Sequence, residues 1–91
     1  MDRAFVCDPA KRAWLLKERG IDLLAMGGIF GDERRRDFPD TRFDYGEPRR
    51  ITIGKMHGRI FTVVYTIRGQ TTWLITAWPS SRKERRHYEQ R

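Results

Sequence analysis

The sequence contains a single cysteine, Cys7, and only two histidines, His57 and His87. One cysteine excludes a disulfide within the chain and is typical of a cytosolic protein, so we expect Cys7 to have a packing role. Neither histidine has a cysteine, histidine or carboxylate at the spacing of a metal site, so we expect no metal and no cofactor. We expect His57 to be solvated in a turn and His87 to be solvated in a basic helix.

Long apolar runs are also missing. No segment is long enough to span a bilayer, and charged residues follow Met1 where a signal peptide would have an apolar stretch. Phosphate-loop, dinucleotide and serine-hydrolase motifs do not occur. These absences argue against a membrane protein, a nucleotide-dependent enzyme and a serine hydrolase. We expect residues 1–91 to form one cytoplasmic domain with a thin core.

Basic residues are what the sequence has in excess. It contains 19 Lys+Arg against 12 Asp+Glu, which gives a net charge of +7. Such a charge favours an anionic partner, namely nucleic acid, an acidic protein or, least of all here, an anionic membrane surface. Arginine predominates, and its planar guanidinium binds phosphate with two hydrogen bonds and stacks on bases. The basic runs therefore indicate either contact with nucleic acid or a solvated surface.

The N-terminal part predicts a strand followed by a helix. Residues 4–8 are typical of a short strand. Asp8 fits the N-cap of a helix, Pro9 its first position and Gly20 its left-handed stop. The buried stripe of this helix is expected to consist of Ala13, Leu15 and Leu16.

The rest of the chain predicts a second helix and then a sheet. Residues 22–30 are typical of a helix that Gly27 and Gly28 weaken. Residues 31–50 are polar and predict a loop with one short strand at Asp37–Phe38. Three runs rich in β-branched and aromatic residues then predict an antiparallel meander. These runs are residues 49–56, 58–67 and 71–78.

The C-terminal segment predicts a basic helix. Pro79 ends the third run, and Ser81 with Glu84 has the spacing of a capping box. The sequence therefore predicts an α+β domain, in which a small antiparallel sheet packs against two N-terminal helices and a C-terminal helix.

Cleavage of RNA is a chemistry that such a basic domain can perform without a metal. RNA carries its own nucleophile, the 2′-hydroxyl, so the protein must align it, move protons and stabilise the charge of the transition state. In the basic helix Arg82, Arg85 and Arg86 share a face, and Tyr88 either contacts the phosphate or fixes the helix to the sheet. For Glu84 the capping role is the preferred interpretation.

The candidate site residues follow from these patterns. The candidates for RNA binding are Arg49, Lys55, Arg59, Arg82 and Lys83. The candidates for catalysis are Arg68, Glu84, Arg85, Arg86 and Tyr88.

The order of short motifs resembles the BrnT family of bacterial toxins. The motifs are F-x-x-D-P-A-K from Phe5 to Lys11, FPD at 38–40, GE-x-R at 46–49, ITIG at 51–54, GR at 58–59, VV at 63–64, T-x-RG at 66–69 and RKERRHYE at 82–89. Each is weak alone, but together they cover nearly the whole chain.

The resemblance implies a fold similar to RelE-type ribonucleases and a metal-independent ribonuclease that stops translation. It implies as partner a cognate BrnA-like antitoxin with a ribbon-helix-helix DNA-binding part, and operator DNA only through the complex with that antitoxin. It also places Arg68, Glu84, Arg85, Arg86 and Tyr88 on family-like positions. A non-catalytic basic module that binds RNA or protein, such as an inactivated toxin, is the alternative.

The sequence also departs from the family pattern. The family usually has Asn where Leu15 stands, His where Arg19 stands and often His where Tyr65 stands. After the last strand it favours an Arg-Lys pair, which Trp78 and Pro79 replace here. The loss of two cations could reduce the activity or rearrange the residues that carry it.

Overall fold

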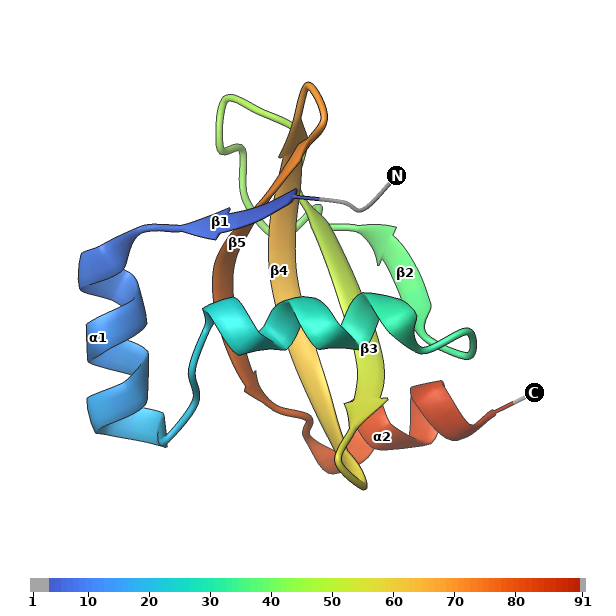
Figure 1. Cartoon of the computed structure of the whole chain (residues 1–91). Helices are drawn as coiled ribbons and strands as arrows, with labels where there is room; N and C mark the ends of the chain where they lie inside the picture. Colours follow the sequence, from blue (N-terminus) through green and yellow to red (C-terminus); the bar gives the residue numbers. More distant parts are fainter. Residues whose placement is uncertain (1–3, 91) are drawn as a thin grey trace.

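A computed structural model describes residues 4–90 (Figure 1). A five-stranded sheet lies at its centre, with the strand order β1-β5-β4-β3-β2. The strands are β1 (Ala4–Cys7), β2 (Arg36–Pro39), β3 (Arg50–Met56), β4 (Arg59–Arg68) and β5 (Thr71–Pro79). The helices are α1 (Pro9–Arg19), the 3-10 helix η1 (Leu24–Gly31) and α2 (Arg82–Glu89).

The predicted meander is confirmed, and β4 is its central strand. The short strand predicted at Asp37–Phe38 is also confirmed as β2, which is antiparallel to β3. The purely antiparallel sheet is wrong, because β1 pairs with β5 in parallel. Turn signals reveal hairpins between neighbouring strands, whereas the pairing of β1 with β5 joins the two ends of the chain and leaves no local signal.

Helix α1 begins and ends as predicted, but it buries a different face. The Asp8 carboxylate accepts a hydrogen bond from Ala10 N at 3.1 Å, and Gly20 closes the helix at φ 67°. Only Leu15 is buried, whereas Ala13 is exposed and Leu16 is 55% exposed, so the predicted stripe is wrong at two positions. Figure 1 shows the cause, because α1 lies beside the sheet at the β1 and β5 edge and does not cross its face.

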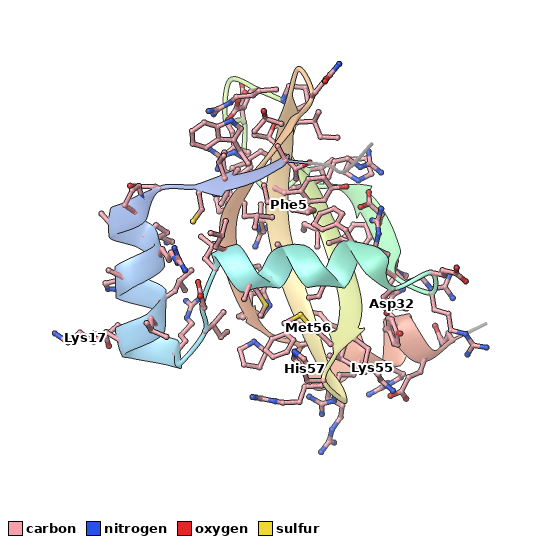
Figure 2. All side chains as sticks on the ribbon, in the orientation of Figure 1. Phe5, Lys17, Asp32, Lys55, Met56 and His57 are labelled. Carbon is pink, nitrogen blue, oxygen red and sulfur yellow. The ribbon has the colours of Figure 1, made fainter. Side chains whose placement is uncertain are left out.

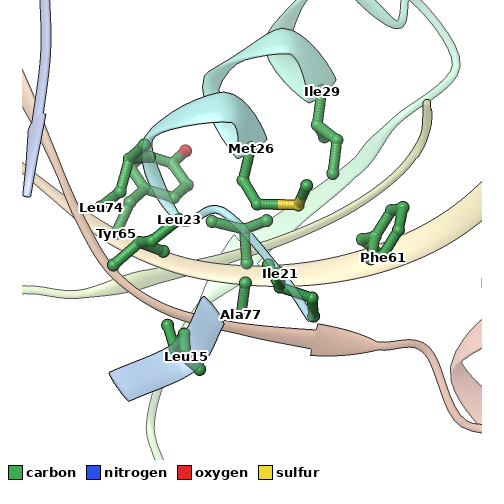
Figure 3. Close-up of a cluster of buried hydrophobic side chains, with 10 residues drawn as sticks. Leu15, Ile21, Leu23, Met26, Ile29, Phe61, Tyr65, Leu74 and Ala77 are labelled. Atoms are coloured by element: carbon green, nitrogen blue, oxygen red, sulfur yellow. The ribbon is translucent and has the colours of Figure 1, made fainter. Parts of the chain in front are cut away.

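The second predicted helix forms as the 3-10 helix η1. It begins at Leu24, whose backbone N–H donates to the Asp22 carboxylate at 3.1 Å. In a 3-10 helix each turn takes three residues, so Leu23, Met26 and Ile29 line one face. All three are at most 4% exposed and pack against the sheet (Figure 3). The apolar side chains repeat with a period of three, which explains why the segment is not an α-helix.

Glycine lets η1 lie directly on β3. A Cβ atom built on Gly54 of β3 would be only 2.5 Å from Ile29 Cγ2 of η1. Gly54 is therefore a contact point between η1 and β3. Because it has no side chain, η1 can pack closely against the sheet at this point.

The two faces of the sheet carry separate cores, because successive side chains of a strand point to opposite faces. One face packs under η1, with Phe61, Val63 and Tyr65 from β4, and Leu15 of α1 joins this core from the β5 edge. The other packs under α2, with Val64 from β4 and Tyr88 from the helix. The predicted capping box opens α2, since Glu84 N lies 3.1 Å from Ser81 Oγ and Ser81 N lies 2.7 Å from Glu84 Oε1.

A buried aspartate organises the loop between β2 and β3. The Asp40 side chain accepts two hydrogen bonds from the Arg42 guanidinium, both 2.9 Å long, and one from the Tyr45 hydroxyl at 3.2 Å. The bonds from Arg42 are the largest cause that lowers the pKa of Asp40, to about 2. The charged form of Asp40 therefore stabilises the fold.

This pKa predicts a specific loss of stability in acid. The unfolded value lies near 3.9, so the contribution of Asp40 is present above about pH 4 and is lost as the pH falls toward 2. At neutral pH we expect Asp40→Asn to lower the free energy of unfolding by about 1–2 kcal/mol, discounted for the exposed Arg42. Urea titrations from pH 2 to 7 should show a weaker pH dependence in Asp40→Asn than in the parent. Asp44→Asn, in the same loop but exposed, is the control, and a parallel response of both variants would contradict the assignment.

Candidate active site

Several arginines are neutralised by carboxylates. Asp37 accepts hydrogen bonds from Arg35 at 2.7 Å and from Arg50 at 2.5 Å. Glu47 binds Arg68 at 2.9 Å and lies 3.7 Å from Arg49. The other pairs are Arg12 with Asp22 and Arg42 with Asp40. These arginines contribute little to the field around the molecule, because each has a local counter-charge.

A second set of basic side chains has no ion pair within residues 4–90 and gathers around the β3–β4 turn and α2. Two of them make other contacts, since Arg59 lies over the Phe61 ring at 5.1 Å and Arg85 donates to the Ser80 carbonyl at 2.7 Å. Neither contact removes a charge, so this end of the sheet attracts a polyanion. The set comprises Lys55, Arg59, Arg82, Lys83, Arg85 and Arg86.

A groove of about 730 Å³ opens in this cationic region, between the end of η1, the β3–β4 turn and the end of α2. Figure 2 shows Lys55 and His57 at the turn and Asp32 after η1. A second depression of about 350 Å³ shares Lys55 and adds Arg59 and Arg85. The residues that line the groove are Gly28, Gly31, Asp32, Arg34, Lys55, His57, Gly58, Tyr88 and Glu89.

His57 occupies an unusual backbone position in this groove. It has a φ of 52° and is followed by Gly58 at 77°, as in the tight turns that best join two antiparallel strands. Asn, Asp or Gly is preferred at such a position. The turn therefore holds an exposed imidazole at the groove where asparagine would suit the backbone better. Histidine adopts this left-handed conformation more often than most other side chains do.

Asp32 connects the three segments that form the groove. Its Oδ2 accepts a hydrogen bond from the Tyr88 hydroxyl at 2.6 Å and another from Lys55 N at 2.8 Å. Its Oδ1 accepts from Arg34 N at 2.9 Å. Because these donors come from α2, β3 and the segment after η1, one carboxylate fixes the walls of the groove relative to each other.

The catalytic candidates on α2 lie in different environments. Tyr88 is 6% exposed and contacts Asp32, so its ring fixes the helix to the sheet. Glu84 caps the helix, as preferred from the sequence, and accepts a hydrogen bond from Trp78 Nε1 at 3.1 Å. Arg85 lines the depression beside the groove, and Arg86 is exposed. Of these four residues, only Tyr88 and Arg85 line the groove or its extension.

Two predicted residues lie at the other end of the sheet. Arg68 ends β4, whereas Arg59 begins it, and ten residues of strand separate the two ends by about 30 Å. Arg49, just before β3, shares Glu47 with Arg68. The structure thus does not bring Arg49 and Arg68 together with the α2 arginines.

Sequence patterns did not reveal His57 and Asp32 as members of a site. The His-Gly pair between two strand-like runs was a signal for a tight turn, and it could have shown that His57 lies next to Lys55 and Arg59. Asp32 gave no signal, because its contacts with Tyr88 and Lys55 arise only in the folded chain.

Cys7 is half-buried and packs against the core under η1, as predicted. Burial raises the pKa of its thiol, which disfavours the reactive thiolate.

Within residues 4–90 no three His, Cys, Asp or Glu side chains are grouped closely enough to hold a metal ion. In the same residues, no helix has the length and apolar character that crossing a bilayer requires.

A small α+β domain with histidine, lysine and tyrosine around a cationic groove has the features of a protein that acts on RNA. Residues 7–84 match the family model described as ribonuclease toxin, BrnT, of type II toxin-antitoxin system. The chain belongs to this family, so the resemblance seen in its motifs is confirmed, and a protein antitoxin is implied as its partner. None of the curated proteins compared with the chain matches it.

The family match covers only part of the groove. Asp32, Lys55 and His57 lie within the matched residues, whereas Arg85 and Tyr88 lie beyond their end at Glu84. The residues that match the family model therefore include the walls of the groove formed by η1 and the β3–β4 turn, but not the end of α2.

Three of the residues that depart from the expected family pattern pack within the fold, namely Leu15, Tyr65 and Trp78. Leu15 is fully buried, and Trp78 donates to the helix cap at Glu84. The Tyr65 hydroxyl donates to Asp37, and burial followed by this bond raises the pKa of Tyr65. Burial alone would raise the pKa of Asp37, but the bonds from Tyr65 and Arg50 outweigh it and lower that pKa. Leu15, Tyr65 and Trp78 therefore contribute to the fold, whereas Pro79 is exposed and lines the depression beside the groove.

Proposed function

We propose that this protein is a metal-independent endoribonuclease whose cleavage of RNA inhibits translation. The observation that carries the proposal is the position of His57 in a groove with Lys55, where neither side chain has an ion pair or side-chain hydrogen bond within residues 4–90. Membership in a family of ribonuclease toxins supports it. The likeness to RelE-type ribonucleases is part of the proposal and rests on the order of the motifs.

The proposed reaction uses the 2′-hydroxyl of the RNA as the nucleophile. Its oxygen bonds to the adjacent phosphorus while the bond from phosphorus to the 5′-oxygen breaks. His57 accepts the proton of the 2′-hydroxyl, and the departing 5′-oxygen takes a proton from water. Lys55 and Arg85 stabilise the added negative charge on the phosphate oxygens. No step in this scheme requires a metal ion.

The candidates named from the sequence take different parts in this scheme. Arg85 binds the phosphate, and Tyr88 positions the groove through Asp32. Glu84 acts indirectly, because it caps α2, the helix that carries Arg85. Arg86 extends the cationic surface along α2. Arg68 contacts the RNA only if the RNA chain extends along the whole length of the sheet.

The antitoxin is proposed to follow the BrnA-like pattern. We infer that it has a ribbon-helix-helix part and that operator DNA is bound only by the complex of both proteins. The support is the family to which this chain belongs, together with the basic surface, which suits an acidic segment of a partner as well as RNA.

RNA cleavage by the purified protein tests the proposal. We expect full activity in excess EDTA and its loss at saturating antitoxin. Activity that disappears with EDTA and returns with one added metal would contradict the mechanism. Tight binding of RNA without cleavage would favour the non-catalytic basic module instead.

A further inference from the structure

A second hollow lies on a different side of α2 from the groove. It has a volume of about 460 Å³ and is bounded by α2 and by the edge strand β2. Phe38 and Ile53, which belong to the core on the α2 face, provide its apolar surface. His87 forms one wall, with its ring edge-on to Phe38 at 5.6 Å. The hollow shares none of the residues that line the groove.

The outer edge of β2 has no neighbouring strand within residues 4–90 (Figure 1). Such an edge presents backbone groups that can pair with an added strand. Side chains alternate along β2, and Arg36 and Phe38 point to the α2 face. Every second side chain of a strand added here would point to that same face, where the hollow lies.

The charges around the hollow are complementary to a carboxylate. The Nε atom of Arg36 is buried and has no hydrogen-bond partner in residues 4–90, and Lys83 has no ion pair there. The nearby carboxylates are engaged, since Asp37 binds two arginines and Glu84 caps α2. A buried donor without an acceptor is costly, so an acidic side chain placed at Arg36 would stabilise a complex.

We propose that an extended segment of the antitoxin docks here, adding a strand to β2. One acidic side chain of the segment pairs with Arg36 and Lys83, and an apolar side chain covers Phe38. A strand edge selects a peptide, because pairing with it requires a peptide backbone, which RNA lacks. The inference rests on the proposed function in one respect, namely that the partner is an antitoxin.

Charge reversal at Arg36 tests the docking surface. The probe is the cognate antitoxin, whose affinity is measured by calorimetry for the parent and for Arg36→Glu. We expect the dissociation constant to rise by at least about 30-fold, since breaking a buried charged contact has effects of that size. Lys17→Glu, an equal charge change on the exposed side of α1 (Figure 2), should leave it unchanged. RNA cleavage by Arg36→Glu should stay within about twofold of the parent.

Hydrogen exchange on the parent protein gives a second readout that does not depend on how the variant folds. Antitoxin should slow exchange of the amide hydrogens on the outer edge of residues 36–38, since Pro39 has no amide hydrogen. Unchanged exchange there, or unchanged affinity of a folded Arg36→Glu variant, would overturn the proposal, as would protection of these amides by RNA alone. If the parent proves unable to cleave RNA, the binding and exchange results still decide the docking site.

Discussion

Replacing His57 with asparagine should reduce the rate of RNA cleavage by about 10²–10⁴-fold, the usual contribution of a positioned acid or base. Asparagine is preferred in the left-handed conformation that His57 adopts at φ 52°, so the β3–β4 turn should form unchanged. The substitution therefore removes the imidazole without disturbing the backbone that carries Lys55. Cleavage of a defined RNA oligonucleotide in single-turnover conditions measures the effect on the chemical step.

His87→Asn is the matched control. It removes the other histidine of the chain, which lies on α2 against Phe38 and outside the groove. This variant should cleave RNA at close to the parental rate. If both variants retained the same activity, His57 would have no part in the chemistry.

Gly54→Ala should lower the free energy of unfolding by about 1–3 kcal/mol, as for overpacked cores. The new methyl group would lie 2.5 Å from Ile29 Cγ2 and 3.4 Å from Arg35 Cβ. Because Gly54 is in the interior of β3, the strain must move η1. RNA cleavage should fall as well, because η1 leads into Asp32, which fixes the groove.

A double variant shows whether the contact with Ile29 is the cause. Ile29→Ala removes the atom that clashes, so Gly54→Ala combined with Ile29→Ala should cost less than the sum of the two single variants in urea unfolding. Gly31→Ala is the control, because a Cβ there meets nothing within 4 Å. Additive losses, or a similar loss for Gly31→Ala, would show that η1 does not rest on Gly54.

The sequence predicted those parts of the fold that depend on local signals. The cap at Asp8, the stop at Gly20 and the capping box at Ser81 all form as predicted, because each acts within one turn of helix. The three long strands form for the same reason, since their turns and alternation are local. The buried face of α1 did not follow from its sequence, because it depends on where the helix docks, and Leu16 remains exposed.

The candidate site shows the same limit. Sequence patterns identified Lys55, Arg85 and Tyr88, but they grouped Arg68 with them although it lies at the far end of β4. A list of basic residues cannot distinguish charges that a carboxylate neutralises from those that remain free. The contact of Asp32 with Tyr88 joins residues far apart in the chain, so only the fold could reveal it.

The chemistry of the RNA ends tests the central claim most directly. If His57 activates the 2′-hydroxyl, cleavage in excess EDTA should leave a 2′,3′-cyclic phosphate on one fragment and a 5′-hydroxyl on the other, and His57→Asn should reduce both products together. Mass spectrometry of the fragments from a defined oligonucleotide measures the ends. Fragments with a 3′-hydroxyl and a 5′-phosphate would contradict the account, because water and not the RNA would then have been the nucleophile.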